Sequence, residues 1–346
     1  MEGSRGKDAA SRVSLVEEAV ISPMACARAL VSAICVLSCF FLFSGVSIAA
    51  VPANGQAVAG SADKALLYGH VKFLSTIHPR RNHAYPEALD KVAAYIRKSF
   101  EASGCSVSEQ VFKPDGIIEY RNVICSLGPE DGALLVFGAH YDVEGYSDGA
   151  DDNASGVAGV LELARLLGGR KDALKSRVQL VAYTLEEPPY FSTDMMGSAV
   201  HAKSLKESGQ EVRLMVAVEM IGYFTSKPKS QRYPAFFLKW FYPSTGDFIA
   251  VVGRWGQGSI VKRVHRIMAN GSSVPVSSLG APRSLTGIDF SDHRSFWKYG
   301  FPAVMVTDTA FFRNPNYHEL GDRVETLDFD KMSGVVDALL RVALEY

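Results

Sequence analysis

The sequence predicts an α/β protein, a three-layer α/β/α sandwich built on a mixed central sheet that is mainly parallel. Three observations support this prediction. Strand-like apolar runs alternate with helical segments along much of the chain, and such alternation is typical of a sheet with helices on both faces. The strands are almost continuously apolar, as buried parallel strands are. Polar clusters follow the strands, at the places where α/β proteins bind ligands.

The expected elements follow one another in a regular order. Residues 87–104 carry apolar side chains at helical spacing and end at a glycine, which predicts a helix. Two strands, at 105–112 and 121–127, flank a Pro-Asp-Gly turn. The remaining elements are a strand at 133–142, a helix at 154–169, a strand at 177–187, a helix at 196–209 and strands at 212–222 and 301–308. Residues 224–287 are less regular, and we expect an insertion there that walls a substrate cleft.

The composition narrows the class of protein. The 346 residues are 47% hydrophobic and 21% charged, which is ordinary for a globular domain and excludes a disordered or fibrous chain. The formal net charge is −1, so the sequence gives no reason to expect a nucleic-acid partner, whose phosphates call for a basic surface.

The N-terminal segment differs from the rest of the chain. Residues 29–50 are strongly apolar and uncharged, and they follow Arg28. We interpret residues 1–53 as a leader, either a cleaved secretory signal, which the small residues near its end favour, or an uncleaved membrane anchor. Met24 is an alternative start. Either reading predicts an exported protein, periplasmic or extracellular, with a linker at 54–63 and a single catalytic domain at 64–346.

Cysteine usage agrees with export but decides little. Three of the five cysteines lie in the leader, which leaves Cys105 and Cys125 in neighbouring strand-like runs. An exported protein can join such a pair. The sequence leaves this disulfide open.

Charged side chains gather after the apolar strand at 133–142. Residues 138–156 contain five acidic residues and one histidine, without a lysine or arginine. Carboxylates packed this closely raise one another's pKa unless a cation neutralises them. Other strand ends add further acids and a second histidine, and this nitrogen and oxygen ligand set suits zinc. The candidate ligands are His140, Asp152, Glu187, Glu219 and His318, enough for two ions that share a carboxylate, as in metallohydrolases.

Six short motifs carry a resemblance to a known family. They are "HYD" at 140–142, "GADDNASG" at 149–156, "EE" at 186–187 with "MGSAVHA" downstream, "EMIG" at 219–222, "SDHRSFW" at 291–297 and "YHELGD" at 317–322. In this order they resemble the exported di-zinc aminopeptidases of peptidase family M28, which share their fold with glutaminyl cyclases. The resemblance covers the chain from about residue 64 to its end. It implies the zinc-exopeptidase fold, of the phosphorylase/hydrolase-like type, and two zinc ions.

The resemblance also implies roles for individual residues. Asp152 would bridge the two ions, His140 and Glu219 would complete one site, and Glu187 and His318 the other. The remaining roles fall to residues beside the ligands. Glu186 would be the general base of a metal-activated water, Asp142 would orient the imidazole of His140 with Asp151 as a similar candidate, and Tyr317 would donate to the developing oxyanion. Many aminopeptidases of the family have aspartate where this chain has Glu219, and a glutamate can still ligate.

Three functions follow as hypotheses. The first is a zinc-dependent aminopeptidase that acts on peptides with a free N-terminus, with Glu144 and Asp148 as candidates for holding the α-amino group. The second is a glutaminyl-peptide cyclotransferase, which would use a single zinc. The third is a carboxypeptidase-type exopeptidase with Arg283 or Arg313 on the substrate carboxylate. The presence of both histidines and of the acidic loop favours two ions and peptide hydrolysis. A binding domain that kept only the scaffold would be expected to lack some of these ligands.

Overall fold

The computed structural model describes residues 60–346. The predicted leader at 1–53, including the apolar segment at 29–50, and most of the predicted linker lie outside these residues. Export, cleavage and membrane anchoring therefore stay predictions. Between residues 60 and 346 no helix is both long and apolar enough to cross a membrane.

An eight-stranded mixed sheet forms the centre of the fold, in the order β1-β2-β4-β3-β5-β8-β6-β7. The four middle strands, β4, β3, β5 and β8, are parallel to one another, whereas β1, β2 and the β6–β8 pair introduce antiparallel neighbours. The strands are β1 Ser106–Phe112, β2 Tyr120–Leu127, β3 Leu134–His140, β4 Arg177–Tyr183, β5 Val212–Glu219, β6 Ile249–Arg254, β7 Val276–Ala281 and β8 Ala303–Thr307. The predicted mainly parallel sheet is confirmed.

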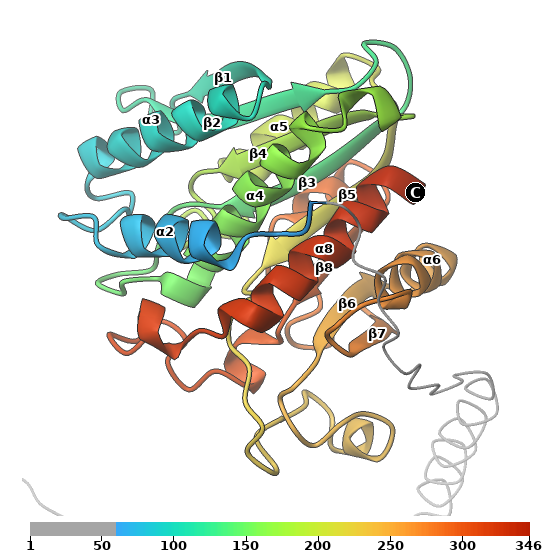
Figure 1. Ribbon diagram of the computed structural model, residues 1–346. Coiled ribbons are helices and arrows are strands. Elements are labelled where there is room, and N and C mark those ends of the chain that lie inside the picture. Colours follow the sequence, from blue (N-terminus) through green and yellow to red (C-terminus); the bar gives the residue numbers. More distant parts are fainter. Residues whose placement is uncertain (1–59) are drawn as a thin grey trace, which may run out of the picture. The chain divides into compact units, whose positions relative to one another are not determined.

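Helices cover both faces of the sheet, which completes the three layers (Figure 1). A large apolar core lies between one face and the helices α2 Lys64–Ser75, α3 Pro86–Ala102, α4 Gly156–Gly168, α6 Gly258–Ala269 and α8 Phe329–Glu345. A second core lies on the opposite face beneath α5 Gly197–Glu207 and α7 His293–Lys298. Short 3-10 turns are η3 Lys171–Ala173, η4 Phe236–Trp240, η5 Ala310–Phe312 and η6 Val324–Thr326, and η2 Ala150–Ser155 is a π-type turn.

The predicted insertion is only partly irregular. Residues 224–248 lack regular structure apart from η4, but residues 249–281 form β6, α6 and β7 and extend the sheet. The prediction was wrong for this second part because each strand is only six residues long and the prediction took the surrounding Pro, Gly and aromatic residues as a sign of irregular structure. The segment still walls a cavity, as described below.

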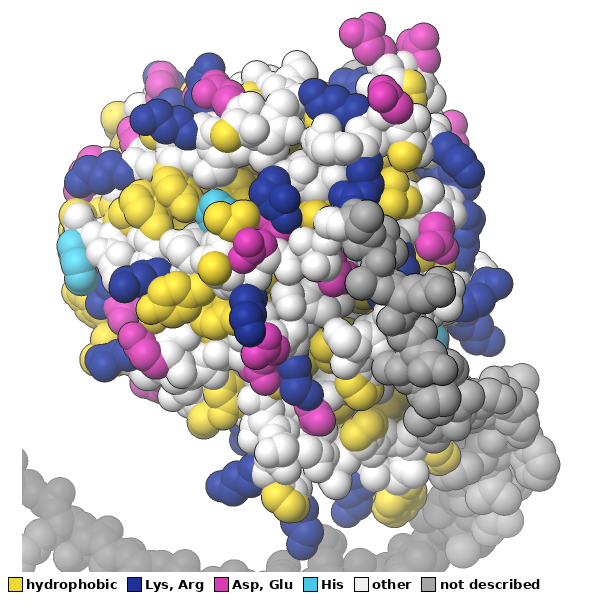
Figure 2. Space-filling view, in the orientation of Figure 1, with side chains coloured by type: hydrophobic (Ala, Val, Ile, Leu, Met, Phe, Trp, Pro, Cys, Tyr) yellow, Lys and Arg dark blue, Asp and Glu magenta, His cyan; other side chains and the backbone are white. Residues whose placement is uncertain are grey.

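Two features complete the scaffold. Cys105 and Cys125 form a disulfide with a Cα–Cα distance of 5.2 Å, which ties the start of β1 to β2 and settles the open pairing. On the face shown in Figure 2, positive and negative side chains are interspersed. Surface ion pairs include that between Lys64 and Asp330.

Candidate metal centre and active site

The carboxyl ends of the parallel strands meet at one edge of the sheet, and the predicted ligands lie there. β3 ends at His140 and β5 ends at Glu219. Glu187 follows β4, and His318 lies in the segment after β8. Asp152 belongs to η2, which leads into α4. Segments far apart in the sequence thus bring all five predicted ligands together.

The ligand atoms form two sets that share Asp152. In the first set, Nε2 of His140 lies 3.3 Å from Oδ1 of Asp152 and 3.4 Å from Oε2 of Glu219. In the second, Nε2 of His318 lies 3.2 Å from Oδ2 of Asp152 and 3.5 Å from Oε2 of Glu187. The two oxygens of one carboxylate therefore face two different histidines. This is the partition that the family resemblance implies, with Asp152 between the two sets.

The spacing of these atoms fits zinc. Two ligands about 2.1 Å from one tetrahedral ion lie roughly 3.4 Å apart, close to the four separations above. Good hydrogen bonds between nitrogen and oxygen are usually shorter. Nε2 of His318 and Oε1 of Glu187 are also buried without a hydrogen-bond partner among the described residues. Buried polar atoms seldom lack a partner, so these unpartnered atoms favour a cation in this cluster.

Burial and mutual repulsion dominate the electrostatics of this cluster. Burial raises the pKa of Glu186 well above its ordinary value, and it raises the pKa of Glu187 likewise, with the Asp152 charge adding to the shift. Burial alone lowers the pKa of His140, but the charges of Glu219 and Glu186 outweigh it and raise that pKa. The cluster holds more negative charge than its two imidazoles balance, which favours binding of a cation.

Asp142 lies between His140 and the segment that carries the predicted base. Its carboxylate oxygen lies 3.7 Å from Nδ1 of His140, too far for a hydrogen bond. The backbone carbonyl of Asp142, 3.2 Å from Nδ1, orients the imidazole instead. The carboxylate accepts hydrogen bonds from the backbone N–H groups of Glu186 and Glu187, at 3.1 and 3.0 Å. Asp142 therefore positions the segment that carries the predicted base.

The carboxylates of Asp151 and Asp322 accept hydrogen bonds mainly from backbone N–H groups. Asp151 accepts the N–H of Gly222 at 3.0 Å and the side-chain amide of Asn314 at 2.8 Å, so it joins the segments that follow β5 and β8. Asp322 accepts the N–H groups of Asp151 and Asp152 at 2.8 and 3.0 Å. These contacts fix the turn that presents Asp152.

Glu219 is held by two neighbours that the sequence does not single out as ligands. The hydroxyl of Ser291 donates to its Oε2 at 2.6 Å. The side-chain amide of Asn153 donates to the same oxygen at 3.3 Å and to the carbonyl of Val218 at 2.9 Å. A glutamate with one oxygen fixed in this way can present a defined geometry to an ion.

Arg81 is a buried cation beneath the acidic turn, and the sequence gives no signal for it. Its side chain is only 2% exposed and donates to four backbone carbonyls. These belong to Leu74, Tyr141, Asp148 and Gly149, at 2.5 to 2.9 Å. Burial lowers the pKa of Arg81 to about 10, so the guanidinium stays charged at neutral pH.

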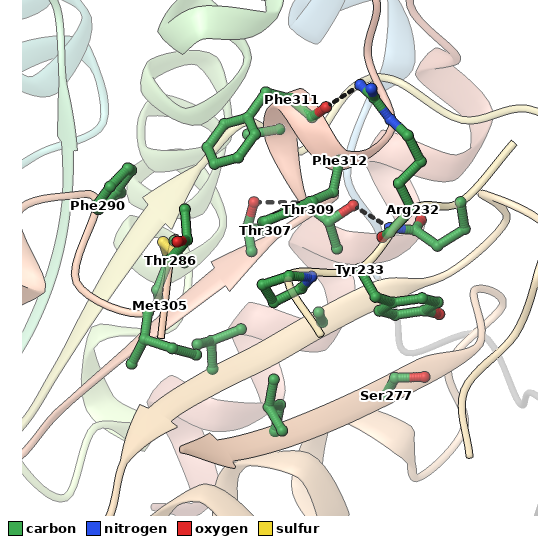
Figure 3. Close-up of a pocket in the computed structure, with 18 of the residues that line it drawn as sticks. Arg232, Tyr233, Ser277, Thr286, Phe290, Met305, Thr307, Thr309, Phe311 and Phe312 are labelled. Atoms are coloured by element: carbon green, nitrogen blue, oxygen red, sulfur yellow. Dashed lines mark hydrogen bonds between the residues drawn. The ribbon is translucent and has the colours of Figure 1, made fainter. Parts of the chain in front are cut away.

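A cavity opens beside the candidate metal centre, with Glu219 and Tyr317 in its wall. It has about 810 Å³ of space, counting the part open to solvent. Figure 3 shows Phe290, Phe311 and Met305 among the largely apolar side chains around it. The ring of Tyr317 stacks on His318 at 3.8 Å and packs against Phe311 at 5.3 Å. Burial raises the pKa of the Tyr317 hydroxyl, which therefore remains a hydrogen-bond donor.

The candidates for binding substrate termini occupy varied places. Asp148 forms an ion pair with Arg80, so its charge is already partnered. Arg313 is buried, donates to Gln231 at 2.9 Å and packs over the ring of Phe248 at 4.6 Å, so it supports the cavity wall. Arg283 is largely exposed and pairs with Asp289 at 3.2 Å.

The chain matches a known protein family over more than half of its length. A model of peptidase family M28 matches residues 122–343. The chain belongs to peptidase family M28. It is 46% identical over 279 residues to YfbL of Escherichia coli strain K12, an uncharacterized protein, covering 78% of this chain and 84% of that one. It is also 28% identical over 256 residues to a probable leucine aminopeptidase of Trichophyton verrucosum, covering 71% of this chain and 62% of the relative.

Solved structures show that this M28 peptidase shares its fold with two kinds of enzyme. The LapA aminopeptidase of Legionella pneumophila matches with a TM-score of 0.65 at 19% identity, over 82% of this chain and 72% of that one. A glutaminyl cyclase of Bacteroides thetaiotaomicron matches with a TM-score of 0.63 at 18% identity, over 83% and 99%. These likenesses confirm the predicted fold. Membership of a peptidase family makes the chain a peptide hydrolase by descent.

Proposed function

We propose that the protein is a zinc-dependent aminopeptidase that removes N-terminal residues from peptides, with Glu186 as general base. The observation that carries the proposal is the carboxylate of Asp152, whose two oxygens face His140 and His318 at 3.3 and 3.2 Å. This arrangement would hold two ions on one bridging aspartate. When bound, zinc polarises the scissile carbonyl and lowers the pKa of a water molecule toward neutrality.

The chain's own residues would handle the proton. Oε2 of Glu186 lies 4.0 Å from Nε2 of His140, so the carboxylate borders the ligand cluster without belonging to the two sets described above. Burial raises the pKa of Glu186 well above its ordinary value, which helps the carboxylate to hold a proton between the two steps. Glu186 would take a proton from the attacking water and give it to the leaving amine.

Tyr317 and the apolar cavity would position the substrate. The Tyr317 hydroxyl would donate to the oxygen that becomes negative as the carbonyl is attacked. The cavity beside it, with Phe290 and Phe311 in its wall, suits a large apolar side chain on the N-terminal residue. The names of curated relatives, leucine aminopeptidases among them, support the same substrate class.

Metal content and product identity test this proposal together. The purified protein should hold two zinc ions per chain and release the N-terminal residue from apolar peptides such as Leu-Gly-Gly. Glu186→Gln should keep both ions and lose turnover by about 100-fold or more, and His318→Ala should hold fewer ions. Glu130→Gln, an exposed glutamate on a distant turn, is the matched control and should behave as wild type. Normal turnover of Glu186→Gln would refute its role. One zinc together with pyroglutamate from an N-terminal glutamine would favour the cyclase.

A further inference from the structure

A second, basic pocket lies between α5, α7 and the segment that follows the glutamate pair. Its lining residues include three cationic side chains and several hydroxyls but no carboxylate. The residues are Ser192, Thr193, Met196, Ala199, Arg283, Arg294, Ser295 and Lys298. Asp289 and Asp194 pair with these cations from outside the lining. The lining itself therefore offers cationic and hydroxyl donors, which suit an anion.

Arg294 places this pocket next to the active site. Its guanidinium stacks over the ring of Phe191 at 4.5 Å. The N–H of Phe191 bonds to the carbonyl of Glu187, so the ring lies one turn beyond the glutamate pair. Phe191 in turn contacts Phe290 of the apolar cavity, with ring centroids 5.9 Å apart. Arg294 therefore stands where the segment after Glu187 meets the cavity.

The guanidinium is held in place yet keeps donors for a ligand. Its side chain is only 16% exposed. Nη2 donates to the hydroxyl of Ser192 at 2.7 Å and lies 3.7 Å from Asp289. Nε and Nη1 donate to no other residue in the described part of the chain. An arginine held through one nitrogen still has donors with which to bind a carboxylate.

The chemistry of the reaction identifies which part of the substrate comes here. A general base that hands its proton to the leaving amine must lie on the leaving-group side of the scissile bond. Arg294 lies on that side, next to the Glu186–Glu187 segment, while the apolar cavity adjoins Glu219 and Tyr317. We infer that Arg294 and its pocket bind the free α-carboxylate of a short peptide, so that the preferred substrates are di- and tripeptides. This inference rests on the proposed aminopeptidase function and names its substrate class.

Matched substrates test the inference directly. Phe-Ala and Phe-Ala amide share the scissile bond and differ in the terminal negative charge. The wild-type kcat/KM should be about tenfold or more higher for the free acid, the usual effect of a charge-assisted contact. That preference should fade in longer peptides, since each added residue moves the carboxylate by about 3.5 Å. In Arg294→Gln the ratio of acid to amide should fall to about one, and Arg294→Lys should restore part of it. Arg213→Gln, a cation exposed on β5, should keep the wild-type ratio.

A binding measurement separates substrate recognition from turnover. Calorimetry on Glu186→Gln should show tighter binding of Phe-Ala than of its amide, and the double variant Glu186→Gln/Arg294→Gln should lose the difference. If wild-type kcat/KM is about the same for Phe-Ala and Phe-Ala amide, the inference is overturned, and this result needs no variant to fold. An acid-to-amide ratio that is the same in Arg294→Gln as in wild type would also overturn it. If the zinc-loaded protein cleaves neither peptide, the proposed function itself fails, which is a distinct result.

Discussion

Replacing Arg81 should destabilise the whole domain, because this one side chain holds the acidic turn from below. It donates to four backbone carbonyls from a position that is 2% exposed. Arg81→Gln would leave at least two of these buried acceptors without a donor. It would also remove the positive charge that faces Asp322, Asp152 and Asp142.

The expected loss can be worked from these contacts. At about 1 kcal/mol for each of the four hydrogen bonds, the free energy of unfolding falls by roughly 4 kcal/mol, before the unpaired carboxylates are counted. For a domain of this size 1 kcal/mol corresponds to about 2 °C in Tm. Arg81→Gln should therefore unfold about 8 °C or more below wild type. Arg81→Lys should lie between them, since an ammonium keeps the charge but cannot reach all four carbonyls.

The neighbouring arginine provides a matched control. Arg80 differs from Arg81 by one position and forms a partly exposed ion pair with Asp148. Such a pair contributes about 1 kcal/mol or less, so Arg80→Gln should shift Tm by no more than about 2 °C. The measurement is thermal unfolding at pH 7 by circular dichroism in excess chelator, so that bound metal adds no stability of its own. If Arg81→Gln unfolds within 2 °C of Arg80→Gln, the assignment of Arg81 as the internal support is wrong.

Three further outcomes are expected. Ser291→Ala should weaken zinc binding about tenfold at the Glu219 site only, measured by chelator competition, because Oε2 of Glu219 loses the shorter of its two hydrogen bonds. Cys105→Ser/Cys125→Ser should lower the free energy of unfolding in urea by about 3 kcal/mol, given the sequence separation of 20. Burial lowers the pKa of His201 from 6.5 to about 4, so between these pH values the unfolded chain takes up a proton that the folded chain does not. The free energy of unfolding should therefore fall by about 3 kcal/mol as the pH is lowered from 6.5 to about 4. His201→Asn should make this decline shallower.

The ligand set was predictable because it depends on where strands end. His140 and Glu219 are the last residues of β3 and β5, and an apolar run that stops at a charged side chain marks such a position in the sequence itself. Parallel strands then bring their carboxyl ends to one edge, whatever the distance along the chain. Asp152 and His318 lie beyond the strands they follow, Asp152 in η2 and His318 in a turn with positive φ, and the polar segments that contain them are the signal in the sequence.

The supports of the site could not be predicted in the same way. Arg81 contacts carbonyls up to 68 positions away, and nothing in the run "HPRRNHAY" distinguishes it from Arg80. Ser291 reaches a glutamate 72 positions away through one hydroxyl. Such roles depend on tertiary contacts between loops rather than on local periodicity. The sequence places Asp142 beside His140, but it does not indicate that the Asp142 carbonyl lies nearer the imidazole than the Asp142 carboxylate does.

The abundance of acids in this site has two separate causes. Loops at the carboxyl ends of strands carry backbone N–H groups that no strand partner accepts, and a buried carboxylate can accept two of them at once. Asp142 and Asp322 each do so, and Asp151 accepts one N–H and one side-chain amide. Asp152 and Glu187 show no such backbone contact, so their oxygens remain for a cation. Counting acids in the sequence therefore overstates the number of metal ligands, and the test that separates the two groups is which carboxylates bind the backbone.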